Sequence, residues 1–223
     1  NPTGSVYSKD ELEALAEVIK KHEGMYVLAD EIYEHINYIG KHESIAQFEG
    51  MKERSIIVNG VSKAYAMTGW RIGFIAAPQW IVKGCNKLQG QYTSGPCSVS
   101  QKAAEAAYTL PQDCVETMRQ AFERRRDLIV SLAKEIPGLE VNKPEGAFYL
   151  FPKCSSFFGK TDGQRTINNS TDFAMYLLEV GHVATVGGDA FGDPDCFRMS
   201  YATSDDNIKE AMSRIKNALS LLK

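Results

Sequence analysis

Blocks of apolar and polar positions along the chain predict alternating helices and buried strands. Three apolar runs in the first half, 26–29, 55–58 and 72–77, predict strands, and the first two are nearly continuous, as in strands covered on both faces. Helical spacing predicts helices at 8–24, 79–88 (ending near Gly90) and 98–108. The gap between the second and third strands is barely long enough for a parallel crossover, so we expect the third strand to be antiparallel.

The second half begins with a long amphipathic pattern from about residue 112 to 136, which predicts one helix with the domain boundary inside it. Beyond it, short strands and helices alternate, which predicts a separate α+β layer. The predicted strands are 139–141, 147–151, 182–185 and 196–201, and the predicted helices are 171–179 and 205–222.

Composition narrows the function classes. The 223 residues are 43% hydrophobic and 24% charged with net charge −3, as in an ordinary soluble protein, and no basic surplus indicates nucleic acid. The basic triplet at 124–126 is expected on the wet face of a helix. No apolar run is long enough to span a membrane. Five cysteines without C-x-x-C spacing and four scattered histidines predict neither disulfides nor a metal site, and favour a reducing, cytoplasmic compartment.

Four residues in three parts of the sequence carry candidate chemistry. The stretch 60–73, GVSKAYAMTGWRIG, places Lys63 in a turn after a strand, with Arg71 eight positions on. Lysine forms Schiff bases with carbonyl groups and arginine grips phosphate, although the pair also fits a loop lysine and a surface arginine. Asp30 ends the strand at 26–29, where it either binds a ligand or caps the turn. Arg198 lies in an apolar strand, where it is either paired or, on an edge strand, directed to solvent.

The stretch 60–73 resembles, position for position, the cofactor-lysine signature of the class I pyridoxal-phosphate aminotransferases (the aspartate aminotransferase family, fold type I). The resemblance implies that Lys63 is the catalytic residue, which holds the cofactor pyridoxal 5'-phosphate as a Schiff base and moves protons. It implies that Arg71 binds the cofactor phosphate and that Ser62 also contacts the cofactor.

Three further strings resemble the same family in the same order. In A-D-E-I-Y, the resemblance assigns Asp30 to the pyridine nitrogen and Tyr33 to the ring's 3-oxygen. In F-R-x-S-x-A, it assigns Arg198 to the substrate α-carboxylate. In N-P-T-G, it assigns Asn1 to both cofactor and carboxylate binding. No metal ligand is implied.

The resemblance also implies the fold class. We expect an α/β protein with an incomplete fold type I large domain (a mostly parallel sheet with helices) at 1–112. An interdomain helix and a smaller α+β C-terminal domain follow at 113–223. Because N-P-T-G lies well inside the large domain in that family, we expect a C-terminal fragment that is inactive alone.

The implied reaction is transamination between an amino acid and a 2-oxo acid, with aspartate and 2-oxoglutarate as the first choice. Alanine, aromatic and kynurenine substrates stay open, because no arginine stands near Gly90, where some members read a distal carboxylate. A different class is also open: aminotransferase-like domains serve as ligand-sensing modules of transcription regulators. For the intact protein we expect a cytoplasmic homodimer that binds neither nucleic acid nor membranes.

Overall fold

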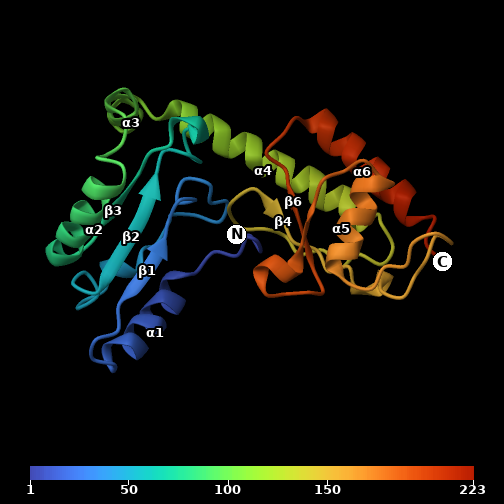
Figure 1. Ribbon diagram of the computed structural model, residues 1–223, viewed down its shortest axis with the longest axis horizontal. Helices are drawn as coiled ribbons and strands as arrows, with labels where there is room; N and C mark the ends of the chain where they lie inside the picture. The colour runs from blue at the N-terminus through green and yellow to red at the C-terminus, as the bar shows by residue number, and fades with distance from the viewer. The chain divides into compact units, whose positions relative to one another are not determined.

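The computed structural model describes all 223 residues, which form two compact units (Figure 1). The amino-terminal unit is Val6–Arg119, and the carboxyl-terminal unit is Asn1–Ser5 together with Gln120–Lys223. The long helix α4 (Asp113–Lys134) contributes residues to both units. None of the helices combines the length and apolar character that crossing a membrane requires.

Helix α1 (Lys9–Lys20) begins at a complete capping box. The Ser8 side chain accepts from the Glu11 N–H, and the Glu11 carboxylate accepts from the Ser8 N–H, so two unpaired donors of the first turn are satisfied. The helix buries Leu12 and Ala16 against Ile45 and Met51, which form one hydrophobic cluster. Ile45 belongs to the short 3-10 helix η1 (Ile45–Gln47).

The first sheet has the order β1-β2-β3, with β1 at Val27–Asp30, β2 at Ser55–Gly60 and β3 at Gly73–Ala76 (Figure 1). Strands β1 and β2 are parallel, with Asp30 opposite Val58. Strands β2 and β3 are antiparallel, with Gly60 opposite Gly73, so the predicted direction of the third strand is confirmed.

Helices α2 (Gln79–Tyr92) and α3 (Ser98–Thr109) complete the amino-terminal unit. The predicted helix with its end near Gly90 is confirmed, because α2 ends two residues later, at Tyr92. It stops where Ser94 and Gly95 adopt positive φ, and Pro96 follows. These residues cannot continue a helix, whereas a glycine inside the last turn only weakens it.

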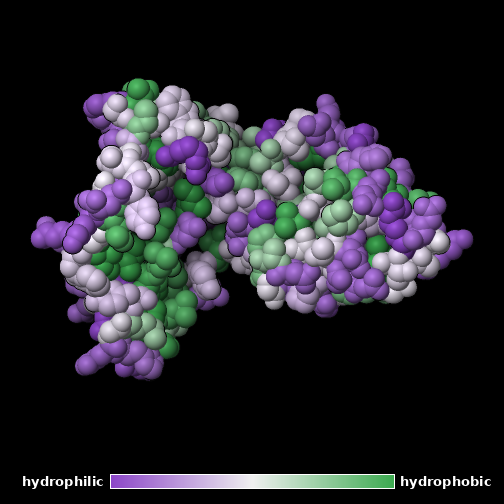
Figure 2. Space-filling model, in the orientation of Figure 1, coloured by the Kyte–Doolittle hydropathy of each residue, from purple (hydrophilic) through white to green (hydrophobic).

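The amino-terminal unit leaves much apolar surface open. Leu28 in β1 is 72% exposed, Trp80 in α2 is 62% exposed, and α2 buries none of its residues. Figure 2 shows hydrophobic residues spread over the face of this unit that is turned to the viewer. Within this chain the first strand is therefore not covered on both faces.

The carboxyl-terminal unit is an α+β layer. Its antiparallel sheet has the order β4-β6-β5, and helices α5 and α6 supply much of its core together with α4. Its largest buried side chains include Phe173, Tyr176, Phe197 and Tyr201. The elements are β4 (Tyr149–Leu150), η3 (Ser155–Phe157), α5 (Ser170–Glu179), β5 (Val186–Gly187), η4 (Gly188–Phe191), β6 (Phe197–Ser200) and α6 (Asp205–Leu219).

Two strands predicted in this unit are wrong. Residues 182–185 instead follow the end of helix α5 at Glu179, where the Val183 N–H donates back to the Leu177 carbonyl (3.0 Å) and His182 adopts φ 54°; the strand β5 starts only at Val186. Residues 139–141 form a single bridge, Glu140 to Lys153, rather than a strand. Local apolar character predicted both strands, but neither segment finds the hydrogen-bond partners that a strand needs.

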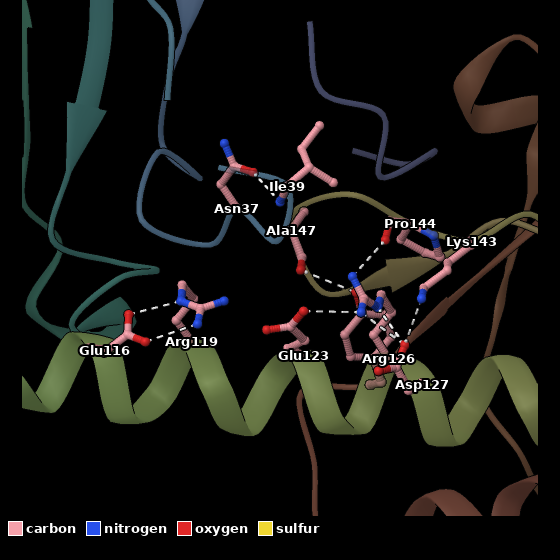
Figure 3. A network of polar contacts seen from close by, with 11 residues as sticks. Asn37, Ile39, Glu116, Arg119, Glu123, Arg126, Asp127, Lys143, Pro144 and Ala147 are labelled. Atoms are coloured by element: carbon pink, nitrogen blue, oxygen red, sulfur yellow. Dashed lines mark hydrogen bonds and ion pairs between the residues drawn. The ribbon is translucent and has the colours of Figure 1, made fainter. Parts of the chain in front are cut away.

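Arg126, expected on a wet helix face, is buried instead (Figure 3). Its guanidinium lies 2.9 Å from the Asp127 carboxylate and 3.3 Å from that of Glu123, and it donates to the Pro144 carbonyl at 3.4 Å. Arg124, two positions earlier, is exposed and pairs with Asp205. Helical rotation thus places the first and last members of one basic triplet in different environments.

Candidate functional site

Asp30 is the last residue of β1 and Lys63 follows the end of β2, and these strands are parallel and paired, so both residues belong to the same edge of the first sheet. The Glu31 N–H donates to the Val58 carbonyl (2.9 Å), which extends the pairing one residue beyond β1. The exposed Asp30 carboxylate accepts from the Ile32 N–H at 3.2 Å. Asp30 therefore does cap the turn, through one oxygen, and its position at the strand end leaves the other oxygen accessible to a ligand.

Tyr33 lies in the turn that follows. The Glu34 N–H donates to the Glu31 carbonyl (2.9 Å), and the Ile36 N–H donates to the Tyr33 carbonyl (2.8 Å). The Tyr33 side chain is half-buried. Two consecutive turns thus hold the backbone that carries this phenol.

The stretch 60–73 is a loop whose two ends meet. A Cβ on Gly60 would lie 2.8 Å from the Cα of Gly73 and 2.9 Å from the Ile72 carbonyl, so only glycine allows this approach. Within the loop, Val61 and Ala64 are buried, and the Ala66 N–H donates to the Lys63 carbonyl at 3.1 Å. Lys63 and Ser62 are half-buried between these anchors.

Arg71 lies at the other end of this loop. It adopts a left-handed conformation (φ 52°, ψ 51°) at the end of the 3-10 helix η2 (Thr68–Trp70), and its guanidinium donates to the Thr68 carbonyl at 2.9 Å. Ala66 has φ 52° as well. Left-handed non-glycine residues are strained, and such strain gathers at ligand sites. One donor of the exposed guanidinium is used, and a phosphate could take others.

Sequence reasoning missed the side chains that support this edge. The Tyr65 hydroxyl donates to Gln112 Oε1 at 2.8 Å, and its ring packs edge-on against Tyr108. Burial raises the pKa of Tyr65, and that of Tyr108 to about 12, so both phenols stay protonated at neutral pH.

Glu31 was missed as well. Its carboxylate lies 3.0 Å from His42 Nε2 and accepts from the Ser44 hydroxyl at 2.6 Å. The hydrogen bond to Glu31 is the main cause that raises the pKa of His42. The only available signal was the position of Glu31 directly after Asp30, because His42 and Ser44 are remote in sequence.

Arg198 and Asn1 belong to the carboxyl-terminal unit, where they meet. The Arg198 guanidinium donates to Asn1 Oδ1 at 2.9 Å, and its carbon lies 4.6 Å from the ring centroids of both Tyr149 and Phe191. Strand β6 is the central strand of its sheet. The alternative of an edge strand with a solvent-directed arginine is therefore wrong.

The first residues are held in place by the same unit. The Gly4 carbonyl accepts from the N–H groups of Glu145 and Gly146, at 2.8 and 2.9 Å. The Asn142 side chain donates to the Thr3 carbonyl at 2.9 Å. These bonds fix the segment that carries Asn1.

The donor set of the amino-terminal unit fits pyridoxal phosphate. An amine for the aldehyde (Lys63) follows β2, a guanidinium for the phosphate (Arg71) precedes β3, and a carboxylate for the ring nitrogen (Asp30) ends β1. Tyr33 and Ser62 add hydroxyl groups. The close approach of Gly60 and Gly73 shapes the loop that bears the two cations.

Known proteins resemble the chain over its whole length. Residues 1–215 match the family model "Aminotransferase class I and II". A bifunctional aspartate aminotransferase and glutamate/aspartate-prephenate aminotransferase from Petunia hybrida is 49% identical, over all of this chain and 48% of that protein. An aspartate aminotransferase from Rhizobium meliloti is 48% identical, over 98% of this chain and 54% of that protein.

Solved structures agree. The crystal structure of the Rhizobium meliloti aspartate aminotransferase has a TM-score of 0.95 at 46% identity, covering all of this chain and 56% of that one. An aromatic aminotransferase from Pyrococcus horikoshii has a TM-score of 0.89 at 40% identity, covering 99% and 57%. This chain thus spans about half the length of the relatives it matches. With the fold and the ordered strings in agreement, the chain belongs to the aminotransferase class I and II family.

Proposed function

We propose that the protein to which this chain contributes is a pyridoxal-phosphate-dependent aminotransferase acting on aspartate and 2-oxoglutarate. The observation that carries the proposal is the loop 60–73, which presents Lys63 and Arg71 beside the end of the strand that bears Asp30. The names of the relatives from Petunia hybrida and Rhizobium meliloti support aspartate as the amino donor. Matches to dedicated enzymes at this identity favour an enzyme over a ligand-sensing module.

When bound, the cofactor supplies an electron sink that stabilises negative charge at the substrate Cα. Lys63 would hold it covalently, and the Lys63 amine would move a proton to and from Cα. Asp30 keeps the ring nitrogen protonated by a charge-assisted hydrogen bond. Tyr33 would donate to the ring's 3-oxygen, Arg71 would bind the phosphate, and Ser62 and Asn1 would also contact the cofactor.

Arg198 and Asn1 bind the substrate α-carboxylate in this proposal. The two neighbouring rings restrict the rotation of the planar guanidinium, and the Asn1 contact leaves further donors for a two-pronged grip on the carboxylate. The arrangement selects α-amino acids but does not distinguish their side chains. Prephenate is therefore a second acceptor to test, because the Petunia hybrida relative is named for it.

The rest of the active protein is also part of the proposal. Residues 1–112 contribute to the large cofactor-binding domain and 113–223 form the connecting helix and small domain. Leu28 and Trp80 are exposed, and the edges of the three-stranded sheet are open. Both features support the inference that further polypeptide covers this surface in the active protein. We infer a cytoplasmic homodimer, and we infer that the 223-residue chain alone is inactive.

Reconstitution tests the proposal. The chain is purified alone and after co-expression with the remaining part of the Rhizobium meliloti relative, and each sample is assayed with aspartate, 2-oxoglutarate or prephenate, and added cofactor. Turnover is expected only in the reconstituted protein. Borohydride reduction and peptide mapping should then place the pyridoxyl group on Lys63.

Lys63→Ala should abolish the label and nearly all turnover, while Lys83→Ala, in exposed helix α2, should leave both unchanged. A label on another lysine would contradict the assignment of Lys63. Turnover by the monomeric chain would show that the inference of inactivity is wrong.

A further inference from the structure

The Glu31 carboxylate, at the start of the segment after β1, binds two side chains from the end of that segment, His42 and Ser44. Glu31 Oε2 lies 3.0 Å from His42 Nε2, and Glu31 Oε1 accepts from the Ser44 hydroxyl at 2.6 Å. The Glu31 side chain is 11% exposed, so this carboxylate is largely removed from water. A largely buried carboxylate with two short hydrogen bonds holds its partners more strongly than an exposed one.

One end of this arrangement is fixed in the hydrophobic core. Ser44 also accepts from the Ala46 N–H (3.3 Å) at the start of η1, and the next residue, Ile45, packs in the cluster of Leu12 and Met51. The Glu31 carboxylate therefore joins the end of β1 to the packed part of the amino-terminal unit.

The other end is the candidate cofactor site. Glu31 directly follows Asp30 and precedes Tyr33 by two residues. Its N–H donates to Val58 and its carbonyl accepts from Glu34, so both its backbone and its side chain are fixed. Any shift of Glu31 would move the Asp30 carboxylate and the Tyr33 phenol.

We propose that Glu31 is a positioning residue: His42 and Ser44 hold its carboxylate so that Asp30 and Tyr33 keep their places for the cofactor ring. This inference rests on the proposed function. Asp30 and Tyr33 would touch the ring, whereas Glu31 acts through them.

The interaction between Glu31 and His42 depends on pH because His42 lies near three carboxylates. Glu31, Glu34 and Glu43 all favour its protonated form, which raises the pKa of His42, with the Glu31 hydrogen bond as the largest cause. Glu34 is itself bonded to His35 and Asn59. Stability from this raised pKa is complete below the ordinary value of about 6.5 and is lost as pH rises through the raised pKa. The ion pair therefore weakens toward alkaline pH, and a neutral hydrogen bond remains.

Hydrogen exchange in the full chain tests whether Glu31 fixes the segment after β1. The amides of Glu34 and Ile36, which donate within the two turns, report on the segment. Glu31→Ala should speed their exchange by about ten-fold or more, relative to the amides of α1. Glu31→Gln should restore most of the protection, because an amide oxygen still accepts from Ser44. Glu49→Gln, at an exposed glutamate after η1, is the matched control and should change nothing.

The reconstituted protein tests the positioning. In wild type, the absorbance of the bound cofactor is titrated with pH and its dissociation constant is measured. Glu31→Ala should weaken cofactor binding by about ten-fold and shift the absorbance titration, and Glu31→Gln should recover both. The difference between His42→Gln and wild type should shrink as pH rises.

Unchanged hydrogen exchange in Glu31→Ala would contradict the claim that Glu31 fixes the segment after β1. Faster exchange with unchanged cofactor affinity and absorbance overturns the positioning role. If the wild-type protein takes up no cofactor, the proposed function fails, and the positioning role fails with it. The hydrogen-exchange result still shows, independently, whether Glu31 fixes the segment after β1.

Discussion

The Arg198 guanidinium donates to Asn1 Oδ1 at 2.9 Å, although 197 positions separate the two residues in the chain. Tyr149 and Phe191 flank the same guanidinium at 4.6 Å. The two aromatic rings hold the cation by cation–π attraction and limit the directions in which its remaining donors can point. This is an arginine arranged in advance for a planar anion.

Arg198→Ala should therefore weaken amino-acid and 2-oxo-acid binding in the reconstituted enzyme while sparing the cofactor. Loss of one half of a desolvated charge pair costs about 2–5 kcal/mol in binding. The KM values for aspartate and 2-oxoglutarate measure the loss of substrate binding, and the cofactor dissociation constant shows whether cofactor binding is spared. Arg214→Ala, on the surface of α6 beside Glu210, is the control. Unchanged KM values in Arg198→Ala would refute the assignment.

Gly60→Ala should disturb the loop that carries Lys63. The new Cβ would lie 2.8 Å from the Cα of Gly73, so β2 and β3 must separate, at a cost of about 1–3 kcal/mol. Gly84→Ala in α2 meets no atom within 4 Å and should instead stabilise the helix by about 0.5–1 kcal/mol. Urea unfolding of the two variants compares them. Equal stabilities would contradict the close approach of the two strands.

Arg126→Met should destabilise the carboxyl-terminal unit more than Arg124→Met does. The buried Arg126 bridges Glu123 and Asp127, and its loss leaves both carboxylates without that partner, at about 1–3 kcal/mol. Arg124 is exposed and pairs with Asp205, which Arg125 also contacts, so its loss should cost little stability. Thermal unfolding of both variants tests the ranking, and the reverse order would contradict the burial of Arg126.

Cysteine labelling should separate two classes of thiol. Hydrogen bonds from the backbone of Ser100 and Val99 lower the pKa of exposed Cys97, whereas burial raises the pKa of Cys154 and Cys196 to about 12. At about pH 7.5, iodoacetamide should therefore alkylate Cys97 fastest and spare the two buried thiols in the folded chain. Mass spectrometry of time points measures this. Early labelling of Cys154 would contradict the packing of the second sheet.

Several elements could be predicted from the sequence alone, because their causes are local. The capping box at Ser8 and Glu11, the apolar runs of β1 and β2 and the short gap before β3 each determine structure within a few residues. The family could likewise be predicted, because its strings are contiguous. Both the direction of β3 and the family were confirmed.

Tertiary structure decided the features that depend on distant partners. Arg126 is buried because carboxylates and a carbonyl surround it, and residues 182–185 form no strand because the Val183 N–H bonds to the Leu177 carbonyl of α5. Arg198 is held by Asn1 and two rings from elsewhere in the chain, and Glu31 by His42 and Ser44. Residue type and spacing indicate which groups can bond. Only the folded backbone determines which of them meet, because a hydrogen bond needs its two atoms within about 3 Å.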